Sequence, residues 1–387
     1  MKNFYFLIST LPNINDFGMI QLGEGLKKMG MSFYANRDYW KTDVNEDYLF
    51  KYNEAFNPST DADIVVLSNS WTENIDPISF QPAPLPLPDW LFNKARRFLL
   101  IYLDLRDGYK TISYTSMFRQ FDFIFRAQKN SKTQNWPNIY PWAFGYQNRV
   151  IKEKKNVGFE NKKFRIAVNF YYSHKYVHQL RELAEKNIIS RFDPSIINRE
   201  VTAREKPKEA FGELMFNQTV GLHNPTYYNI IENTLIVAAF CGYMIPGLPN
   251  DPSVYLVGGN VAKIKKQFYE LISPLSGFER RVIQWDSYRF WETLALGSVP
   301  MHIDLTKYGV ELPVMPTNWK HYIGVDLDNI DETVERVIEE KDLIYQIAKE
   351  GNSWCMNNYS PEASAKRFLK IIGLSESEAH LEPNSVK

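Results

Sequence analysis

The chain has 387 residues, and its 45 Lys and Arg residues balance 45 Asp and Glu residues, so the formal net charge is zero. A neutral chain argues against a general nucleic-acid or anionic-membrane binder, which needs a basic surface, and we expect no nucleic acid among its partners. The only two cysteines, Cys241 and Cys355, exclude a disulfide scaffold and a multi-cysteine zinc module. At roughly 150 residues per domain, the length favours two domains.

The first 150 residues contain several short apolar runs of strand length and one segment with the apolar periodicity of a helix. This order of elements predicts a parallel α/β sheet. Residues 81–89 contain four prolines and predict an irregular loop. Polar residues follow the predicted strands directly, and ligands of open α/β sheets usually bind at this carboxyl edge. The predicted elements are strands at 3–9, 31–35, 64–67, 98–103 and 121–125 and a helix at 18–29 that ends at Gly30.

A charged, apolar-poor stretch at residues 152–163 predicts a linker, after which a second α/β series begins. We therefore expect an N-terminal domain at 1–150, a C-terminal domain at 151–374 and a flexible tail at 375–387. Residues 188–225 are not assigned. The predicted elements are strands at 164–170, 282–284 and 299–303, helices at 173–185, 227–240, 287–296, 330–349 and 361–372, and a helix or strand at 261–272.

Several common catalytic signatures are absent from the sequence. There is no glycine-rich dinucleotide loop, no GxxxxGK[ST] phosphate loop, no GxSxG nucleophile elbow and no HExxH. His174 and His178 stand four residues apart, but nothing nearby completes a metal site. We read them as solvent-facing histidines and expect no bound metal.

The strongest cluster lies at the start of the helix predicted at 287–296. Asp286 is a plausible N-cap, and a capped helix end attracts a diphosphate through its oriented N–H groups. Arg289 has the chemistry to clamp phosphate oxygens, and Glu292 to accept hydrogen bonds from two ribose hydroxyls. The alternative is a capped core helix with one Arg–Glu pair on its surface.

The run from Asp286 to Pro300, DSYRFWETLALGSVP, resembles the C-terminal signature S-x-R-F-W-E-A-L-x-x-G-x-V-P of exostosin-like glycosyltransferases. Looser likenesses extend this match. Leu180-Arg181-Glu182-Leu183 resembles the helix that opens the family's nucleotide domain, and Tyr359-Ser360-Pro361-Glu362 resembles its C-terminal end. The resemblance implies an α/β protein of GT-B architecture, with two Rossmann-like domains facing each other across a cleft.

The same resemblance implies a donor site in the C-terminal domain and an acceptor site in the N-terminal domain. Glu292 matches the acidic residue that binds the donor ribose, and Arg289 and Arg181 are assigned to the donor phosphates. Lys175 is added because it follows that domain's first strand, on the edge where ligands bind. Two further candidates at the helix start are Ser287 and Tyr288.

Inverting transfer also needs a base that takes the acceptor proton, and the resemblance favours inversion. Asp107 is the first candidate and Asp104 the second, both at the end of the strand predicted at 98–103. Asp16, after the first strand, is the third. A turn-forming role is the alternative for each of them, and Asp107-Gly108 is a good turn signal.

We therefore predict a metal-independent glycosyltransferase of polysaccharide biosynthesis. It would move a sugar from a nucleoside-diphosphate donor, without a cofactor, to a glycan, oligosaccharide or other hydroxyl acceptor. The alternatives are a non-catalytic sugar-nucleotide or glycan-binding protein and an epimerase of GT-B shape. The short apolar N-terminus reads as a strand, and no run approaches the ~20 residues of a membrane span, so we expect a cytoplasmic protein. The oligomeric state is left open.

Overall fold

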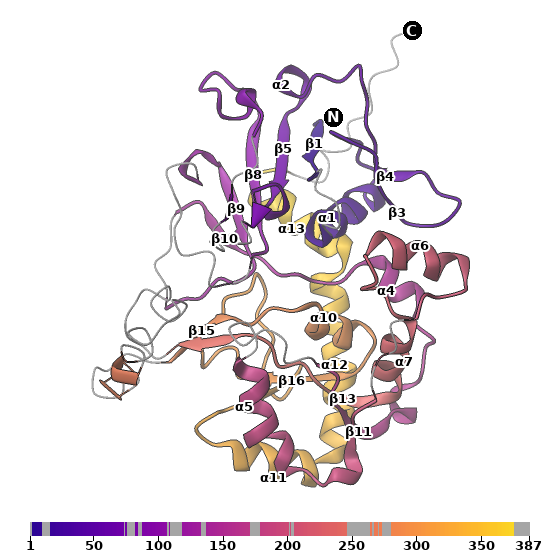
Figure 1. The fold of residues 1–387 in the computed structure, drawn as a ribbon, viewed down its shortest axis with the longest axis vertical. Coiled ribbons are helices and arrows are strands. Elements are labelled where there is room, and N and C mark those ends of the chain that lie inside the picture. The colour runs from indigo at the N-terminus through magenta and orange to yellow at the C-terminus, as the bar shows by residue number, and fades with distance from the viewer. Residues whose placement is uncertain are drawn as a thin grey trace.

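Two parallel sheets, one in each half of the chain, form the centres of two lobes (Figure 1). The computed structural model describes residues 2–9, 16–72, 74–75, 82–83, 87–106, 108, 118–132, 137–170, 179–200, 202, 205–245, 264, 267–269, 271–272 and 280–374. Four predictions lie outside these residues: Lys175, Asp107, the His174 and His178 pair, and the tail at 375–387.

The first sheet has six parallel strands in the order β10-β9-β8-β5-β1-β2. Its central strands are apolar at nearly every position, because both faces are covered. In β1, for example, Phe4 and Phe6 face one core while Tyr5 and Leu7 face another. The predicted strands of this half are confirmed, as β1 (Phe4–Leu7), β2 (Phe33–Ala35), β5 (Ile64–Ser68), β8 (Leu99–Asp104) and β9 (Phe123–Arg126), with β10 (Ile139–Pro141) at the edge.

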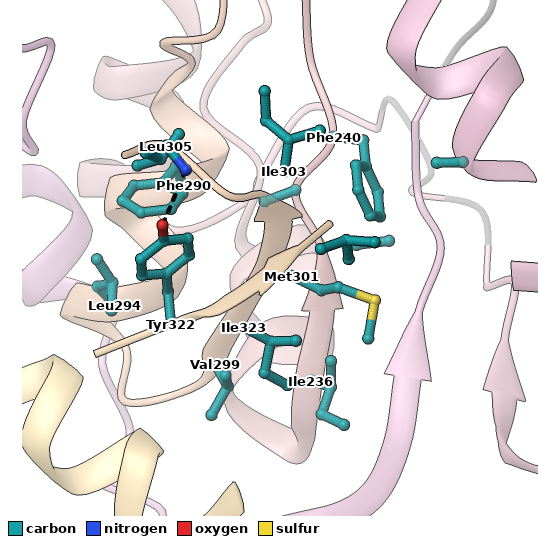
Figure 2. Close-up of a cluster of buried hydrophobic side chains, with 14 of the residues drawn as sticks. Ile236, Phe240, Phe290, Leu294, Val299, Met301, Ile303, Leu305, Tyr322 and Ile323 are labelled. Atoms are coloured by element: carbon teal, nitrogen blue, oxygen red, sulfur yellow. Dashed lines mark hydrogen bonds between the residues drawn. The ribbon is translucent and has the colours of Figure 1, made fainter. Parts of the chain in front are cut away.

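The second sheet has five parallel strands in the order β12-β11-β13-β16-β17. Figure 2 shows part of its core, where Phe290 and Leu294 pack near Tyr322. The Tyr322 hydroxyl accepts a hydrogen bond from the backbone N–H of Leu305 at 2.9 Å, so this buried polar group is satisfied. The strands are β11 (Lys163–Ala167), β12 (Ile197–Asn198), β13 (Thr234–Ala238), β16 (Val299–Ile303) and β17 (Ile323–Val325).

The segment from Tyr227 to Phe240 corrects one prediction. It was expected to be a single helix, but α7 (Pro225–Asn233) ends at Asn233 and the central strand β13 follows directly. A strand buried on both faces shows no alternation, so its apolar run has the same pattern as a buried helix. The helix itself is well marked, because Asn224 caps it by accepting hydrogen bonds from the N–H groups of Thr226 and Tyr227.

Other differences concern element boundaries and short elements. The helix predicted at 330–349 is two helices, α11 (Ile330–Glu339) and α12 (Lys341–Tyr359), because the backbone leaves helical geometry at Glu340. The helix expected from Ser173 is described as α5 (Gln179–Asn187), and the described residues of 261–272 are helical. Elements without a prediction include α6 (Ala210–Gln218), α4 (Asn148–Lys152) and the hairpin of β3 (Tyr39–Lys41) and β4 (Tyr48–Phe50).

The last helix, α13 (Pro361–Ile371), leaves the second lobe and packs against α1 (Phe17–Lys28) of the first (Figure 1). The Gln21 side chain supports this contact by donating to Ser364 Oγ of α13 at 3.2 Å and to the backbone carbonyl of Tyr359, the last residue of α12, at 3.0 Å. A core of the first lobe therefore includes residues near the C-terminus, such as Phe368. The division at residue 150 stays a prediction, and the C-terminal helix is shared with the first lobe.

The approach of α1 to α13 depends on Gly25. A Cβ at this position would lie 2.1 Å from the backbone carbonyl oxygen of Pro361. We expect Gly25→Ala to lower the free energy of unfolding by about 1–3 kcal/mol, because the helices must separate, although alanine is the better helix former. Urea denaturation measures the change. Gly158→Ala is the matched control, because its Cβ meets only flexible side-chain ends, chiefly that of Glu160, and an equal loss in both variants would contradict the prediction.

Among the described helices, none has an apolar stretch of the length that a bilayer crossing requires.

Candidate functional site

The predicted donor helix is present as α10 (Tyr288–Ala295), between β15 (Arg281–Gln284) and β16. Gly297 ends it with a φ of +77°, and the N–H of Ser298 donates to the carbonyl of Thr293, as predicted for a glycine stop. The N-cap residue is Ser287 rather than Asp286. The prediction of Asp286 as the cap was therefore wrong.

Asp286 instead joins the two lobes at the start of α10. Its carboxylate accepts hydrogen bonds from the Phe144 backbone N–H at 2.8 Å and from the Trp291 ring N–H at 2.5 Å. Gln128, after β9, binds the same turn by accepting from the N–H groups of Trp285 and Asp286. Burial raises the pKa of Asp286 to about 7. The helix start is thus held directly against the first lobe.

Two of the predicted phosphate ligands lie together beside α10. The guanidinium groups of Arg289 and Arg181 both lie over the ring of Phe170, at 5.9 and 5.7 Å from its centroid. Burial, together with the charge of Arg289, lowers the pKa of Arg181 to about 10, although the nearby Cys241 opposes this shift. Two neighbouring guanidinium groups repel each other, and an anion between them would relieve that repulsion.

Glu292 lies near this arginine pair and is 6% exposed. Burial raises the pKa of its carboxyl group, while Arg149, Arg289 and hydrogen bonds from the hydroxyls of Tyr227 and Tyr228 act in the opposite direction. Arg149 is the cation in contact with this carboxylate, with 3.5 Å between its Nη2 and Glu292 Oε1. A buried carboxylate with this many donors is oriented in one direction, as a ribose contact requires.

Two buried polar atoms at the helix start have no hydrogen-bond partner among the described residues: Ser287 Oγ and Arg289 Nε. An unsatisfied buried polar atom costs on the order of 1–3 kcal/mol, so such atoms are rare unless a ligand or water completes them. The Arg289 Nη2 group already donates to the Asn169 carbonyl. Thr293 Oγ1, later in the same helix, also has no partner among the described residues, so the property is not confined to the helix start.

The first lobe faces α10 through the start of α1. The ring of Phe17 packs edge-to-face on Tyr288, with 5.0 Å between centroids, and Tyr288 also contacts Phe144 at 4.8 Å. Tyr288 is thus packed between the lobes. Asp16, just before Phe17, is 4% exposed, and its charge raises the pKa of Tyr288, although less than burial does.

Asp16 is held at the carboxyl ends of β1 and β5. Its Oδ2 accepts hydrogen bonds from Ser68 Oγ at 2.5 Å and from Ser70 Oγ. Burial raises the pKa of the Asp16 carboxyl group, and the two serine hydroxyls partly offset the shift. A carboxylate with a raised pKa, close to the donor helix, has the properties of a general base.

The other acceptor-side candidates lie differently. Asp104 is fully buried at the end of β8 and forms an ion pair with Arg106, with 2.8 Å between Oδ1 and Nε. Its role as a base stays a prediction, and the ion pair disfavours it, because the carboxylate already has a buried charged partner. Asp107 lies outside the described residues. Its neighbour Gly108 approaches the second lobe so closely that a Cβ would lie 1.5 Å from the Ile283 carbonyl oxygen.

Sequence reasoning missed three side chains around Glu292: Arg149, Tyr227 and Tyr228. Arg149 lies next to a stretch that reads as a polar linker, and nothing in its local sequence marks it. The tyrosine pair had one usable signal, because Asn224-Pro225 is a strong helix start that places both rings in the first turn of α7.

The buried acid Glu24 predicts how stability depends on pH. Glu24 Oε2 accepts from the Asn148 N–H at 2.8 Å, and burial raises its pKa to about 7. The native state therefore binds more protons than the unfolded state between roughly pH 4.5 and 7, so stability falls as the pH rises through this window. Asp286 acts in the same direction.

We expect Glu24→Gln to raise the free energy of unfolding at about pH 8 by on the order of 3 kcal/mol, with a smaller effect at about pH 5. Urea denaturation at the two pH values measures the difference. Glu54→Gln, at an exposed position, is the control. Equal effects of Glu24→Gln at both pH values would contradict the assignment.

Comparisons with known proteins place the fold but not the family. No model of a known protein family matches the chain. No curated protein sequence matches it either. The resemblance to exostosin-like enzymes is therefore not confirmed.

Among solved structures, an α-glucosyltransferase in complex with UDP and a 13-mer DNA aligns with a TM-score of 0.52 at 11% identity, covering 96% of this chain and 99% of that one. A sucrose-phosphate synthase from Thermosynechococcus elongatus aligns with a TM-score of 0.47 at 9% identity, covering 96% and 98%. HepE from Anabaena, with UDP and glucose, aligns with a TM-score of 0.46 at 10% identity, covering 96% and 99%. The predicted α/β fold of GT-B type is confirmed.

The α-glucosyltransferase structure also contradicts one prediction, that nucleic acid is excluded as a partner, because that protein of the same fold was solved with DNA. The error lies in the charge argument. Net charge is a sum over the whole chain, so a total of zero does not exclude a local surface that binds nucleic acid.

Proposed function

We propose that the protein is a glycosyltransferase that moves a sugar from a nucleoside-diphosphate donor to a hydroxyl acceptor. One observation carries the proposal: Arg289, Arg181 and Glu292 gather at the start of α10, where two buried polar atoms lack a partner among the described residues. Two cations suit a diphosphate, and an oriented carboxylate suits a ribose. The proposed place of Lys175 in the same site rests on the sequence alone.

The proposed reaction inverts the anomeric carbon. Asp16 takes the acceptor hydroxyl proton as the oxygen attacks, and the bond between the anomeric carbon and the diphosphate oxygen breaks. The electron pair leaves with the diphosphate, whose growing charge Arg289 and Arg181 stabilise. Asp107 and Asp104 remain the alternative bases, for which the sequence is the support.

A thermal-shift screen against UDP-, GDP-, CMP- and dTDP-linked sugars tests the donor site, because a ligand of the native state raises apparent stability by mass action. The donor that binds is then incubated with oligosaccharides and with DNA carrying hydroxymethyl bases, which offer a free hydroxyl. The α-glucosyltransferase solved with DNA makes the second acceptor worth including. Transfer of the sugar supports the proposal, and no shift with any donor contradicts it.

The same assays separate the alternatives. A binding protein would bind the donor without turnover, and an epimerase would convert the donor sugar with no acceptor present. We expect transfer to continue when EDTA removes divalent cations, because the proposed site stabilises the diphosphate with arginines. Loss of transfer in EDTA, restored by added Mg²⁺ or Mn²⁺, would overturn metal independence and leave the transferase assignment standing.

A further inference from the structure

Arg149 is a buried cation that the proposed transfer does not use. It lies on α4, the short helix after the last strand of the first sheet and before the first strand of the second. Its side chain is 4% exposed. Burying a guanidinium group is costly unless several partners compensate, so the contacts of Arg149 indicate why it is there.

Those contacts reach both lobes. On the donor side, Nη2 lies 3.5 Å from Glu292 Oε1, and Nη1 donates to the Tyr228 hydroxyl. On the acceptor side, the guanidinium group lies 5.0 Å from the centroid of the Phe17 ring, at the first residue of α1. Nε donates to Gln147 Oε1 at 2.6 Å, which fixes the plane of the group.

We propose that Arg149 is a positioning residue, which orients the Glu292 carboxylate toward the donor ribose and holds it in register with the start of α1, next to Asp16. This proposal rests on the proposed function. Arg149 is not assigned to the reacting atoms. It acts through Glu292 on the donor side and through Phe17 on the acceptor side.

The charged groups around Glu292 make this role specific. Arg289 comes from its own helix and is half-buried, with one nitrogen committed to the Asn169 carbonyl. Tyr227 and Tyr228 come from α7 and donate hydrogen bonds without a compensating charge. Arg149, from α4, is therefore the most deeply buried cation among the described groups that act on Glu292.

Two further groups, His223 and Glu153, lie next to Arg149. His223 Nδ1 lies 3.2 Å from Arg149 Nη1, and its Nε2 lies 3.0 Å from Glu153 Oε1. Burial lowers the pKa of His223 despite the glutamate, so the ring is neutral at physiological pH. The negative groups that act on Arg149 are thus Glu292 nearby, Glu24 from α1, and Glu153 through the histidine.

Arg149→Met keeps an unbranched apolar stem in place of the first part of the side chain and removes the guanidinium group with its charge. We expect it to weaken UDP binding roughly tenfold near neutral pH, the size typical of a lost charged hydrogen bond. Without Arg149 the pKa of Glu292 rises further, so the loss of UDP affinity should be larger at low pH than at high pH. The UDP affinity of Arg149→Lys, which keeps the charge, should lie between that of Arg149→Met and that of the wild type.

Isothermal titration calorimetry with UDP measures these affinities. UDP itself titrates in the pH range of these measurements, but this affects the variant and the wild type equally. The ratio of the variant to the wild-type dissociation constant is therefore free of this effect, and we expect this ratio to fall as the pH rises. In a Glu292→Gln background, Arg149→Met should change the UDP dissociation constant by less than about twofold. Arg149 is proposed to act on UDP binding by orienting the Glu292 carboxylate, and that carboxylate is absent in this background. Thermal unfolding of Arg149→Met, Glu292→Gln and the double variant, each measured separately, shows whether each protein is folded.

Three outcomes would overturn the proposal. In the first two, UDP binds to the wild type. Either Arg149→Met leaves the affinity and its pH dependence unchanged, or it weakens binding by the same factor in the wild-type and Glu292→Gln backgrounds. In the third, the wild type binds none of UDP, GDP, CDP and dTDP. That result overturns the proposed function as well, whereas the first two overturn only the role of Arg149.

Discussion

Glu292→Gln is expected to weaken UDP binding by roughly 10- to 100-fold, the range for a lost hydrogen bond to a charged group in a buried site. The carboxylate offers acceptors to both ribose hydroxyls, whereas the glutamine amide replaces one acceptor with a donor. Arg149 would also lose its nearest carboxylate. Calorimetric titration with UDP, or with the nucleoside diphosphate that the screen identifies, measures the change.

Glu335→Gln on the exposed side of α11 is the matched control for the loss of one negative charge. We expect it to bind UDP like the wild type. If Glu292→Gln also binds like the wild type, the ribose does not contact this carboxylate. Arg289 and Arg181 would then need a different explanation, such as a phosphate subsite without a nucleoside.

Asp16→Asn is expected to reduce turnover by about 10²- to 10⁴-fold, the usual contribution of a general base, and to leave UDP binding within about twofold. Asparagine has nearly the same shape and can still accept from Ser68 and Ser70, but it cannot take a proton. Initial rates with the identified donor and acceptor measure turnover, and calorimetry measures binding in the same preparation.

Asp104→Asn and Asp107→Asn, assayed in parallel, decide among the three candidate bases. Loss of turnover in Asp107→Asn with full turnover in Asp16→Asn would support the ranking made from sequence. Loss of stability in Asp104→Asn, by contrast, would reflect its buried ion pair with Arg106. If all three variants turn over normally, none of these three carboxylates is the base, and the anomeric configuration of the product should then be determined to test whether the reaction inverts.

The proposed base also sets the direction of the pH profile. Only the carboxylate form of Asp16 accepts a proton, and burial raises the pKa of this group. Therefore kcat/KM should fall as the pH decreases through that raised pKa. The acidic limb should be absent from whatever residual rate Asp16→Asn retains.

Much of the fold could be read from local sequence. The apolar runs that became β1, β5 and β8 have strand length, and the segment from Ser287 to Ile303 carries its helix, its glycine stop and its strand in consecutive residues. The run from Thr234 to Ala238 could not be read in this way. It is buried on both faces, so the alternation that separates strands from helices is missing.

The site was predictable where it is local and not where it is shared between lobes. Glu292 and Arg289 lie three residues apart on one helix, so their common placement follows from helical geometry. The cap was assigned wrongly for the opposite reason. Asp286 has the residue type of an N-cap, but its carboxylate is used by Phe144, far away in the chain.

Local sequence patterns were enough to predict the two α/β halves and the helix that carries the donor-site candidates, because strand length, helical period and stop signals act over a few neighbouring residues. The distant groups that meet at this helix became visible in the folded chain alone: Arg149 and Tyr228 at Glu292, and Phe17 at Tyr288. Such contacts arise when two lobes pack and bury charge, and the cost of leaving a buried group unpaired, rather than any local pattern, selects the partner.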